Sequence, residues 1–153
     1  MSNVKTKEVL NQAVADLSQF SVVIHQTHWY MRGRAFLTLH PKMDEFMDGI
    51  NDHLDVVAER LITIGGSPYS TLKEFAEQTK IKDQPGTYDK SMEDHLTILL
   101  DGYRYLRELC AEGIKVTEEE NDHVSQDIFI GIKGDVEKTI WMLSAELGQE
   151  PKL

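Results

Sequence analysis

The sequence predicts an all-α protein built as a bundle of four long helices. Apolar residues recur at three-and-four spacing in four long segments, and the two-residue alternation typical of strands is absent from them. One glycine pair and polar breaks separate these segments. The 153 residues are enough for one domain with a sizeable core, and we expect this single domain to span residues 1–153.

The four segments follow one another with clear boundaries. The first, about residues 4–32, places His28 inside its apolar stripe. The second follows the short "RGR" break and stops at Gly65-Gly66, a pattern typical of a helix end. The third follows Tyr88, and the fourth follows "TEEEND". Each segment is therefore predicted to form one helix.

The connections between these helices differ in length, which predicts the topology. Only a few residues join the first helix to the second and the third to the fourth, so each pair should be antiparallel neighbours. The second and third are separated by "GGSPYSTLKEFAEQTKIKDQPGTY", in which "LKEFAEQ" could form a short helix. A four-helix bundle with one long crossover is the ferritin-like topology.

Charge and composition exclude several classes of function. The formal net charge of −10 opposes binding to DNA phosphates or anionic lipid and favours attraction of cations. The opening "MSNVKTKEVLNQ" has no apolar signal region, and no apolar run approaches the roughly 18 residues of a membrane span. We therefore expect a cytoplasmic protein. The single cysteine, Cys110, is best read as a small apolar helix residue, so a metal would need His and carboxylate ligands.

The second helix gathers such ligands on one face. With Asp44 at zero on a helical wheel, His40, Asp55 and Glu59 fall between about −40° and 60°. These residues border the apolar stripe, where an unpaired charge would be costly. His40 with Asp44, and Asp55 with Glu59, form i,i+4 pairs whose members can reach one ion.

The two pairs cannot bind one ion within a straight helix. Their midpoints lie about 22 Å apart at 1.5 Å per residue. They are, however, placed symmetrically on either side of the bond between Gly49 and Ile50. Two copies crossing antiparallel at this point would bring each first pair opposite the other copy's second pair, and Gly49 would allow close approach. Each dimer would hold two equivalent sites, with His28 as a fifth ligand.

Other readings of these residues are open. Taken singly, a histidine on an apolar face is usually a core or interface residue, and helical carboxylates usually form a solvated face. The usual di-iron bundle needs two Glu-x-x-His motifs, whereas this chain has one, from Glu120 to His123, in a predicted turn. The pattern therefore differs from that of an ordinary ferritin subunit.

Three segments carry a resemblance to a known family: "HQTHWYMRG", "FLTLHPKMDEFMDGINDHLDVVAERLITIGGSP" and "DIFIGIKGDVEKTIWMLSAELG". They resemble the Dps miniferritins, especially the peroxide-resistance branch of Gram-positive bacteria. The resemblance covers nearly the whole chain and implies a hollow twelve-subunit cage with ferroxidase sites between two-fold-related subunits. It implies iron ligands at His28, His40 and Asp44 of one subunit and at Asp55 and Glu59 of its partner.

The resemblance also implies the reaction. Fe(II) would be oxidised, preferentially by hydrogen peroxide, with oxygen as the other oxidant, and stored in the cage as ferric mineral, which protects the cell against oxidative damage. Imidazole and carboxylate ligands suit ferrous iron, although zinc accepts the same ligands. The alternatives are a protein that binds and protects DNA, or an inert helical scaffold. Lys5 and Lys7 are the only basic residues among the first ten, so DNA binding is not expected.

Several residues have secondary roles in this prediction. Trp29 could donate electrons to reactive iron–oxygen species or simply pack in an interface, whereas His25, His53 and His95 are predicted to be structural or surface residues. Two groups of acidic residues also have predicted roles. Glu45, Asp48 and Asp52 could nucleate mineral or form a solvated helix face, and Asp122 and Asp127 lie where the family builds acidic three-fold pores. Asp122 could equally cap a helix N-terminus.

Overall fold

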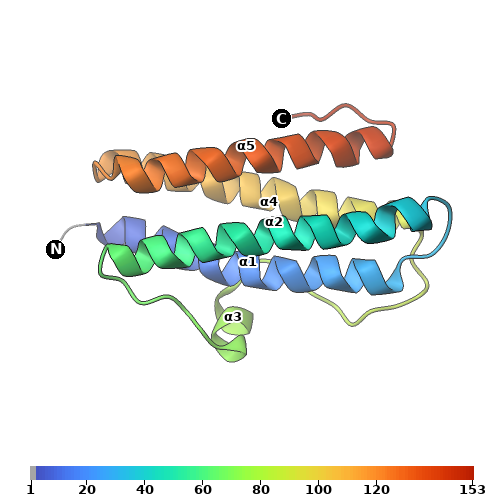
Figure 1. The fold of residues 1–153 in the computed structure, drawn as a ribbon, viewed down its shortest axis with the longest axis horizontal. Helices are drawn as coiled ribbons and strands as arrows, with labels where there is room; N and C mark the ends of the chain where they lie inside the picture. Colours follow the sequence, from blue (N-terminus) through green and yellow to red (C-terminus); the bar gives the residue numbers. More distant parts are fainter. Residues whose placement is uncertain (1–2) are drawn as a thin grey trace.

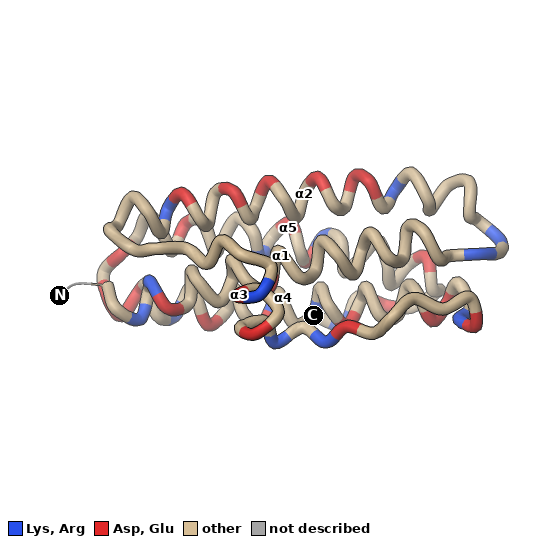
Figure 2. The backbone as a smooth tube through the Cα atoms, turned by 90° about the horizontal axis from the view of Figure 1, so that it is seen from below, with Lys and Arg blue, Asp and Glu red and all other residues tan. Residues whose placement is uncertain are grey.

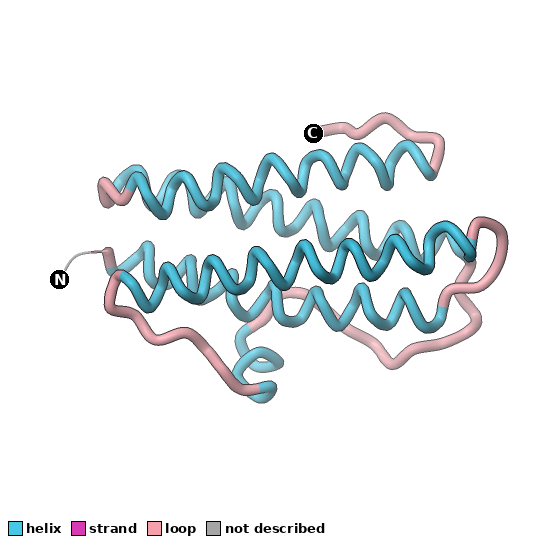
Figure 3. The backbone as a smooth tube through the Cα atoms, in the orientation of Figure 1, coloured by secondary structure: helices cyan, strands magenta, loops and turns pink. Residues whose placement is uncertain are grey.

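The computed structural model describes residues 3–153, which form five helices and no strand. They are α1 (Val4–Tyr30), α2 (Phe36–Thr63), α3 (Leu72–Gln78), α4 (Met92–Glu119) and α5 (His123–Glu146). Figure 3 shows the four long helices joined by two short turns and one long crossover. The predicted all-α bundle is confirmed, and α3 coincides with the segment "LKEFAEQ".

The helices pack as two antiparallel hairpins (Figure 1). α1 packs along α2, and α4 packs along α5, while α1 also contacts α4. α3 stands outside the bundle in the crossover, against α1. One end of the bundle therefore holds the α1–α2 connection, and the other holds the α4–α5 turn beside the end of α2.

The α1–α2 connection is slightly longer than predicted. α1 ends at Tyr30, two residues before the predicted end, because Met31 is extended with ψ at 142°. Gly33 follows with φ at 120°, a conformation that favours glycine. The short break therefore begins at Met31, and it returns the chain directly into α2.

The core lies between the hairpins and is made from the predicted apolar stripes. Leu10, Met43, Leu99 and Ile140 are fully buried, one from each long helix. Cys110 is buried among them, and burial raises the pKa of its thiol to about 12, so the residue is a packed apolar group as predicted. Within residues 3–153, no helix is long and apolar enough to span a membrane.

A buried carboxylate holds the crossover against the bundle. Asp16 on α1 is fully buried and accepts hydrogen bonds from the Thr79 hydroxyl and the Lys80 backbone N–H, both at 2.8 Å. It also accepts one from the Tyr105 hydroxyl on α4 at 2.6 Å. A buried charge is tolerated when it is satisfied in this way, so Asp16 fixes the path that the chain takes between the hairpins.

Candidate metal centre

His28 and His40 hold each other in place where α1 ends and α2 begins. His28 Nδ1 donates to the His40 carbonyl at 2.8 Å, and His40 Nδ1 donates to the His28 carbonyl at 2.9 Å. The His28 carbonyl belongs to the last turn of α1, where backbone acceptors lack an intrahelical partner. The rings stack with centroids 3.7 Å apart and planes 14° apart. Both imidazoles are thus oriented before any ion binds.

These two hydrogen bonds also determine the tautomer of each ring. A carbonyl oxygen can only accept, so each Nδ1 must carry a proton. In a neutral imidazole the other nitrogen, Nε2, then has a free lone pair. A hydrogen bond from the distal nitrogen to a carbonyl is the arrangement that typically orients histidine ligands in metal sites.

Asp44 lies beside this pair, one helical turn after His40. Its Oδ1 is 3.8 Å from His28 Nε2, and its side chain is 58% exposed, whereas that of His28 is 12% exposed. The structure therefore brings together three of the five predicted ligands, His28, His40 and Asp44. They present two imidazole nitrogens and a carboxylate at the edge of the bundle.

Asp55 and Glu59 do not join these three within one subunit. The eleven residues from Asp44 to Asp55 correspond to about 16.5 Å along an α-helix, and α2 is continuous between them. Both carboxylates are exposed. Across residues 3–153 of a single subunit, no group of three or more His, Cys, Asp and Glu side chains is arranged so that it could hold a metal ion, the His28, His40 and Asp44 group included. A single subunit thus carries the predicted ligands in two separated parts.

The acidic face of α2 is open to solvent between the two parts. Acidic residues recur along this helix in Figure 2, and Asp48 and Asp52 are exposed. Glu45 is exposed as well and pairs with Lys42 at 2.6 Å. A Cβ added at Gly49 would meet no atom within 4 Å in the described subunit. The middle of the face is therefore free of contacts from the subunit's own helices.

Trp29, His25, His53 and His95 have contacts of their own outside the proposed ligand set. Trp29 is 62% exposed and stacks on His25, with ring centroids 3.7 Å apart. His53 Nε2 lies 2.7 Å from Asp135 Oδ2 on α5, which joins the two helices. His95 is buried, and burial together with the nearby Lys90 charge lowers its pKa. The contacts of all three histidines are those of structural or surface residues, as predicted.

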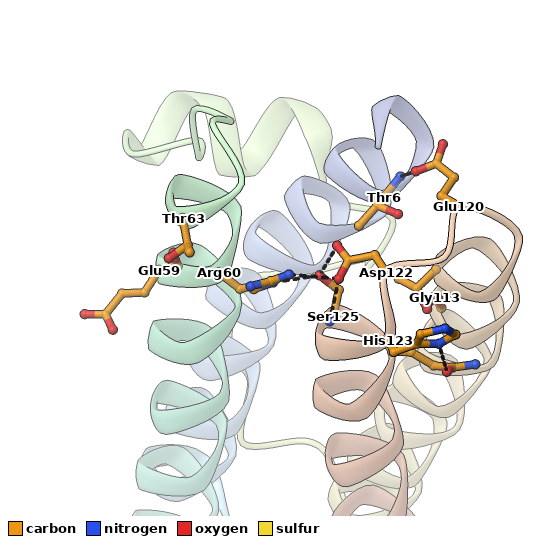
Figure 4. A network of polar contacts seen from close by, with 11 residues as sticks. Thr6, Glu59, Arg60, Thr63, Gly113, Glu120, Asp122, His123 and Ser125 are labelled. Atoms are coloured by element: carbon orange, nitrogen blue, oxygen red, sulfur yellow. Dashed lines mark hydrogen bonds and ion pairs between the residues drawn. The ribbon is translucent and has the colours of Figure 1, made fainter. Parts of the chain in front are cut away.

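The two predicted pore acids have different surroundings. Asp127 is exposed on α5, whereas Asp122 is 6% exposed and is the N-cap of this helix. Asp122 accepts hydrogen bonds from the Ser125 backbone N–H at 3.0 Å and hydroxyl at 2.7 Å, and from Arg60 Nη2 at 2.8 Å (Figure 4). The capping alternative for Asp122 is therefore correct.

The same contacts determine the ionisation of Asp122. Burial by itself would raise the pKa of this carboxyl, but the hydrogen bonds from Ser125 and the Arg60 guanidinium outweigh burial and hold the pKa below its usual value. Our sequence reasoning missed the partnership with Arg60. The only sequence signal was an Asp followed by Ser three residues later at a helix start, which predicts a cap and says nothing of α2.

Comparison with known proteins places this arrangement in a family. The family model described as "Ferritin-like domain" matches residues 7–153. The chain is 53% identical to the "DNA protection during starvation protein" of Streptococcus suis over 97% of this chain and 86% of that protein. The chain belongs to the Dps family of ferritin-like proteins. The Dps relative of the same name in Listeria monocytogenes is 46% identical over 99% of this chain and 97% of its own.

A solved Dps structure has the same fold. A histidine-to-glycine mutant of Listeria innocua Dps superimposes with a TM-score of 0.95, at 45% identity over 99% of this chain and 98% of that one. The predicted ferritin-like fold and the predicted resemblance to Dps are both confirmed.

Proposed function

We propose that this Dps-family chain is a ferroxidase whose site is completed by two subunits. The observation that carries the proposal is the reciprocal pair of hydrogen bonds between His28 and His40, which leaves the Nε2 lone pair of each neutral ring free, with His28 Nε2 lying 3.8 Å from Asp44 Oδ1. A purely structural histidine pair would not need to place the free His28 nitrogen beside an exposed carboxylate. This half-site is oriented but has too few ligands to hold an ion tightly.

The missing ligands would come from a second copy. Antiparallel crossing of two α2 helices at Gly49 would set the partner subunit's Asp55 and Glu59 opposite His28, His40 and Asp44. The open surface around Gly49 and the exposure of both carboxylates support this arrangement. The two-fold operation generates two equivalent sites per dimer. We further propose that dimers assemble into a twelve-subunit cage.

The substrate is ferrous iron. Neutral imidazole and carboxylate oxygen suit Fe(II), and a few ligands at the edge of the bundle leave coordination positions open for an oxidant. Hydrogen peroxide is the proposed preferred oxidant, with oxygen as the slower one. One peroxide takes one electron from each of two ferrous ions and two protons from solvent; its O–O bond breaks and two water molecules form. The ferric product would be stored as mineral in the cage.

Other residues of the acidic face would assist this reaction. Glu45, Asp48 and Asp52 are proposed to bind ferric ions as mineral begins to form, and Trp29 is proposed to supply electrons to reactive oxygen species at the neighbouring site. Zinc would compete for the same ligands, since it also binds imidazole and carboxylate. Listeria innocua Dps has been soaked with zinc and with cobalt for structure determination, which supports divalent cations as probes.

The proposal is tested by Fe(II) oxidation with peroxide and with oxygen, followed by absorbance and compared with the rate without protein. The wild-type cage should oxidise Fe(II) faster than the background, and faster with peroxide. The double variants H40A/D44A and D55A/E59A should each lose nearly all of this activity. As a control, K73A/E77A removes an exposed ion pair from α3, away from the proposed site, and should keep the initial rate. An inert scaffold would show only the background rate.

A further inference from the structure

Arg60 forms a polar tie between the end of α2 and the start of α5. Its Nε donates to the Ser125 hydroxyl at 2.9 Å and its Nη2 to Asp122 Oδ1 at 2.8 Å. The side chains of Arg60 and Asp122 are 18% and 3% exposed. Figure 4 shows the guanidinium reaching across to the α5 N-terminus while Glu59, the preceding residue, points away from it. The guanidinium thus makes two hydrogen bonds in a partly buried position, one residue from a proposed ligand.

The proposed ligands near Arg60 have no support of their own. Within residues 3–153, neither the Asp55 nor the Glu59 carboxylate makes a hydrogen bond or ion pair, and only the Glu59 backbone carbonyl is held, by the Thr63 hydroxyl at 2.8 Å. The positions of both carboxylates therefore depend on the position of the α2 backbone. As a whole, α2 packs along α1, with much weaker packing on α5. Its polar attachments to the second hairpin are the contact of His53 with Asp135 and, beyond Glu59, the contacts of Arg60.

We propose that Arg60 is a positioning residue for the iron site. Its bonds to Asp122 and Ser125 fix the last turns of α2, and thereby hold Asp55 and Glu59 where a partner subunit's histidines can share an ion with them. This inference rests on the proposed function and assigns Arg60 a part in it. Metal sites lose affinity when the residues that orient their ligands are changed, typically by about 10- to 100-fold.

The test is anaerobic calorimetric titration of assembled cages with Co(II), an ion that binds imidazole and carboxylate without being oxidised under these conditions. The R60K variant keeps the positive charge, but a lysine cannot form the bidentate contact to Asp122 and Ser125. Its cages, isolated by size and confirmed by native mass spectrometry, should bind Co(II) about tenfold more weakly than wild type. The KM for Fe(II) should rise more than kcat falls.

A matched control is available on the other hairpin. Arg107 Nε donates to Glu137 at 2.7 Å, and both side chains are 25% exposed, so R107K disturbs a similar interhelical pair between α4 and α5. It should leave Co(II) affinity unchanged. Wild-type affinity in R60K, or an equal loss in R107K, would overturn the positioning role. If R60K cages do not assemble, S125A is the deciding variant. It removes the two hydrogen bonds of the Ser125 hydroxyl, from Arg60 Nε and to Asp122 Oδ2, and leaves the Arg60–Asp122 ion pair. It should weaken Co(II) binding by about threefold, and unchanged affinity would overturn the inference.

The D55A/E59A cage separates the two proposals. It should lose the Co(II) site altogether if the shared centre exists. Should this double variant bind Co(II) as well as wild type, then the shared site itself is wrong. Loss of binding there, with unchanged binding in R60K and S125A, would reject the role of Arg60 alone.

Discussion

The two ends of α2 place their proposed ligands in opposite ways. At the first end, His28 and His40 are fixed directly, because each ring donates to the other residue's backbone carbonyl. At the second end, Asp55 and Glu59 are exposed and unsupported, and the polar contacts belong to Arg60 instead. The imidazoles need a defined tautomer and ring plane, which hydrogen bonds supply. The carboxylates need mainly a defined distance, which a fixed helix end supplies.

The largest effect on stability should follow from removing the contact between Arg60 and Asp122 at the C-terminal end of α2. Asp122→Ala removes the α5 N-cap and leaves the Arg60 charge buried without its partner. We expect the free energy of unfolding to fall by about 3–5 kcal/mol, measured by urea titration at constant subunit concentration. The exposed pair of Lys42 and Glu45 is the contrast, because Glu45→Ala should change it by no more than about 1 kcal/mol. Equal effects of the two variants would contradict the difference in burial.

This stabilisation should also depend on pH. The pKa of Asp122 is lowered in the folded protein, so its contribution is present above the ordinary carboxyl value of 3.8 and is lost as the pH falls through the lowered pKa. The stability difference between wild type and Asp122→Ala should therefore be constant near neutral pH and shrink below 3.8. A difference that grew on acidification would show that the carboxyl is not held ionised by Arg60 and Ser125.

A smaller effect, on the rate of iron delivery, separates the two acids of the α4–α5 region. Asp127 is exposed and makes no ion pair within residues 3–153, so the predicted attraction of cations at a pore can be tested at this residue. Asp127→Asn should slow Fe(II) uptake severalfold at low ionic strength and little at high salt, because salt screens steering. Asp83→Asn removes the same charge from the crossover and is the control. Equal slowing of Fe(II) uptake in both variants would show that uptake depends on the net charge and not on the position of Asp127.

The smallest expected effect is on DNA. The net charge is −10, and acidic residues recur along the exposed face of α2, so phosphate contacts are disfavoured. A gel-shift titration of intact cages with duplex DNA near neutral pH and physiological salt should show no complex at micromolar protein. A complex that dissociates as the salt concentration rises would support the alternative function, DNA binding, independently of the iron site on α2.

Local patterns were enough to predict the helices and the crossover, whereas the ligand assignments stay predictions. Apolar spacing and Gly65-Gly66 mark helix α2, and "LKEFAEQ" marks α3, because helix periodicity and helix stops are properties of neighbouring residues. The hydrogen bonds between His28 and His40 could not be predicted, since they depend on how closely two helix ends approach. The Arg60–Asp122 pair was missed for the same reason, as its members lie 62 residues apart.

The pore prediction illustrates a second limit. Asp122 and Asp127 were grouped because both are acids in one short segment, yet the first is buried as a cap and the second is exposed. Charge counted along a sequence cannot distinguish a carboxylate whose acceptors are already used from one that faces solvent. The preference of Asp for the N-cap position of a helix was the better guide at Asp122.

The most direct measurement of the central claim, that the two ends of α2 act across a subunit boundary, is complementation. The H40A/D44A and D55A/E59A variants are unfolded together, co-assembled, and checked for mixed cages by native mass spectrometry, with each variant refolded alone as the control. In a mixed dimer, one site inherits both defects, while the other joins an intact His28, His40 and Asp44 to the partner subunit's intact Asp55 and Glu59. Peroxide-driven Fe(II) oxidation should return, with about one working site per mixed dimer. Mixed cages as inactive as their parents would contradict the shared site.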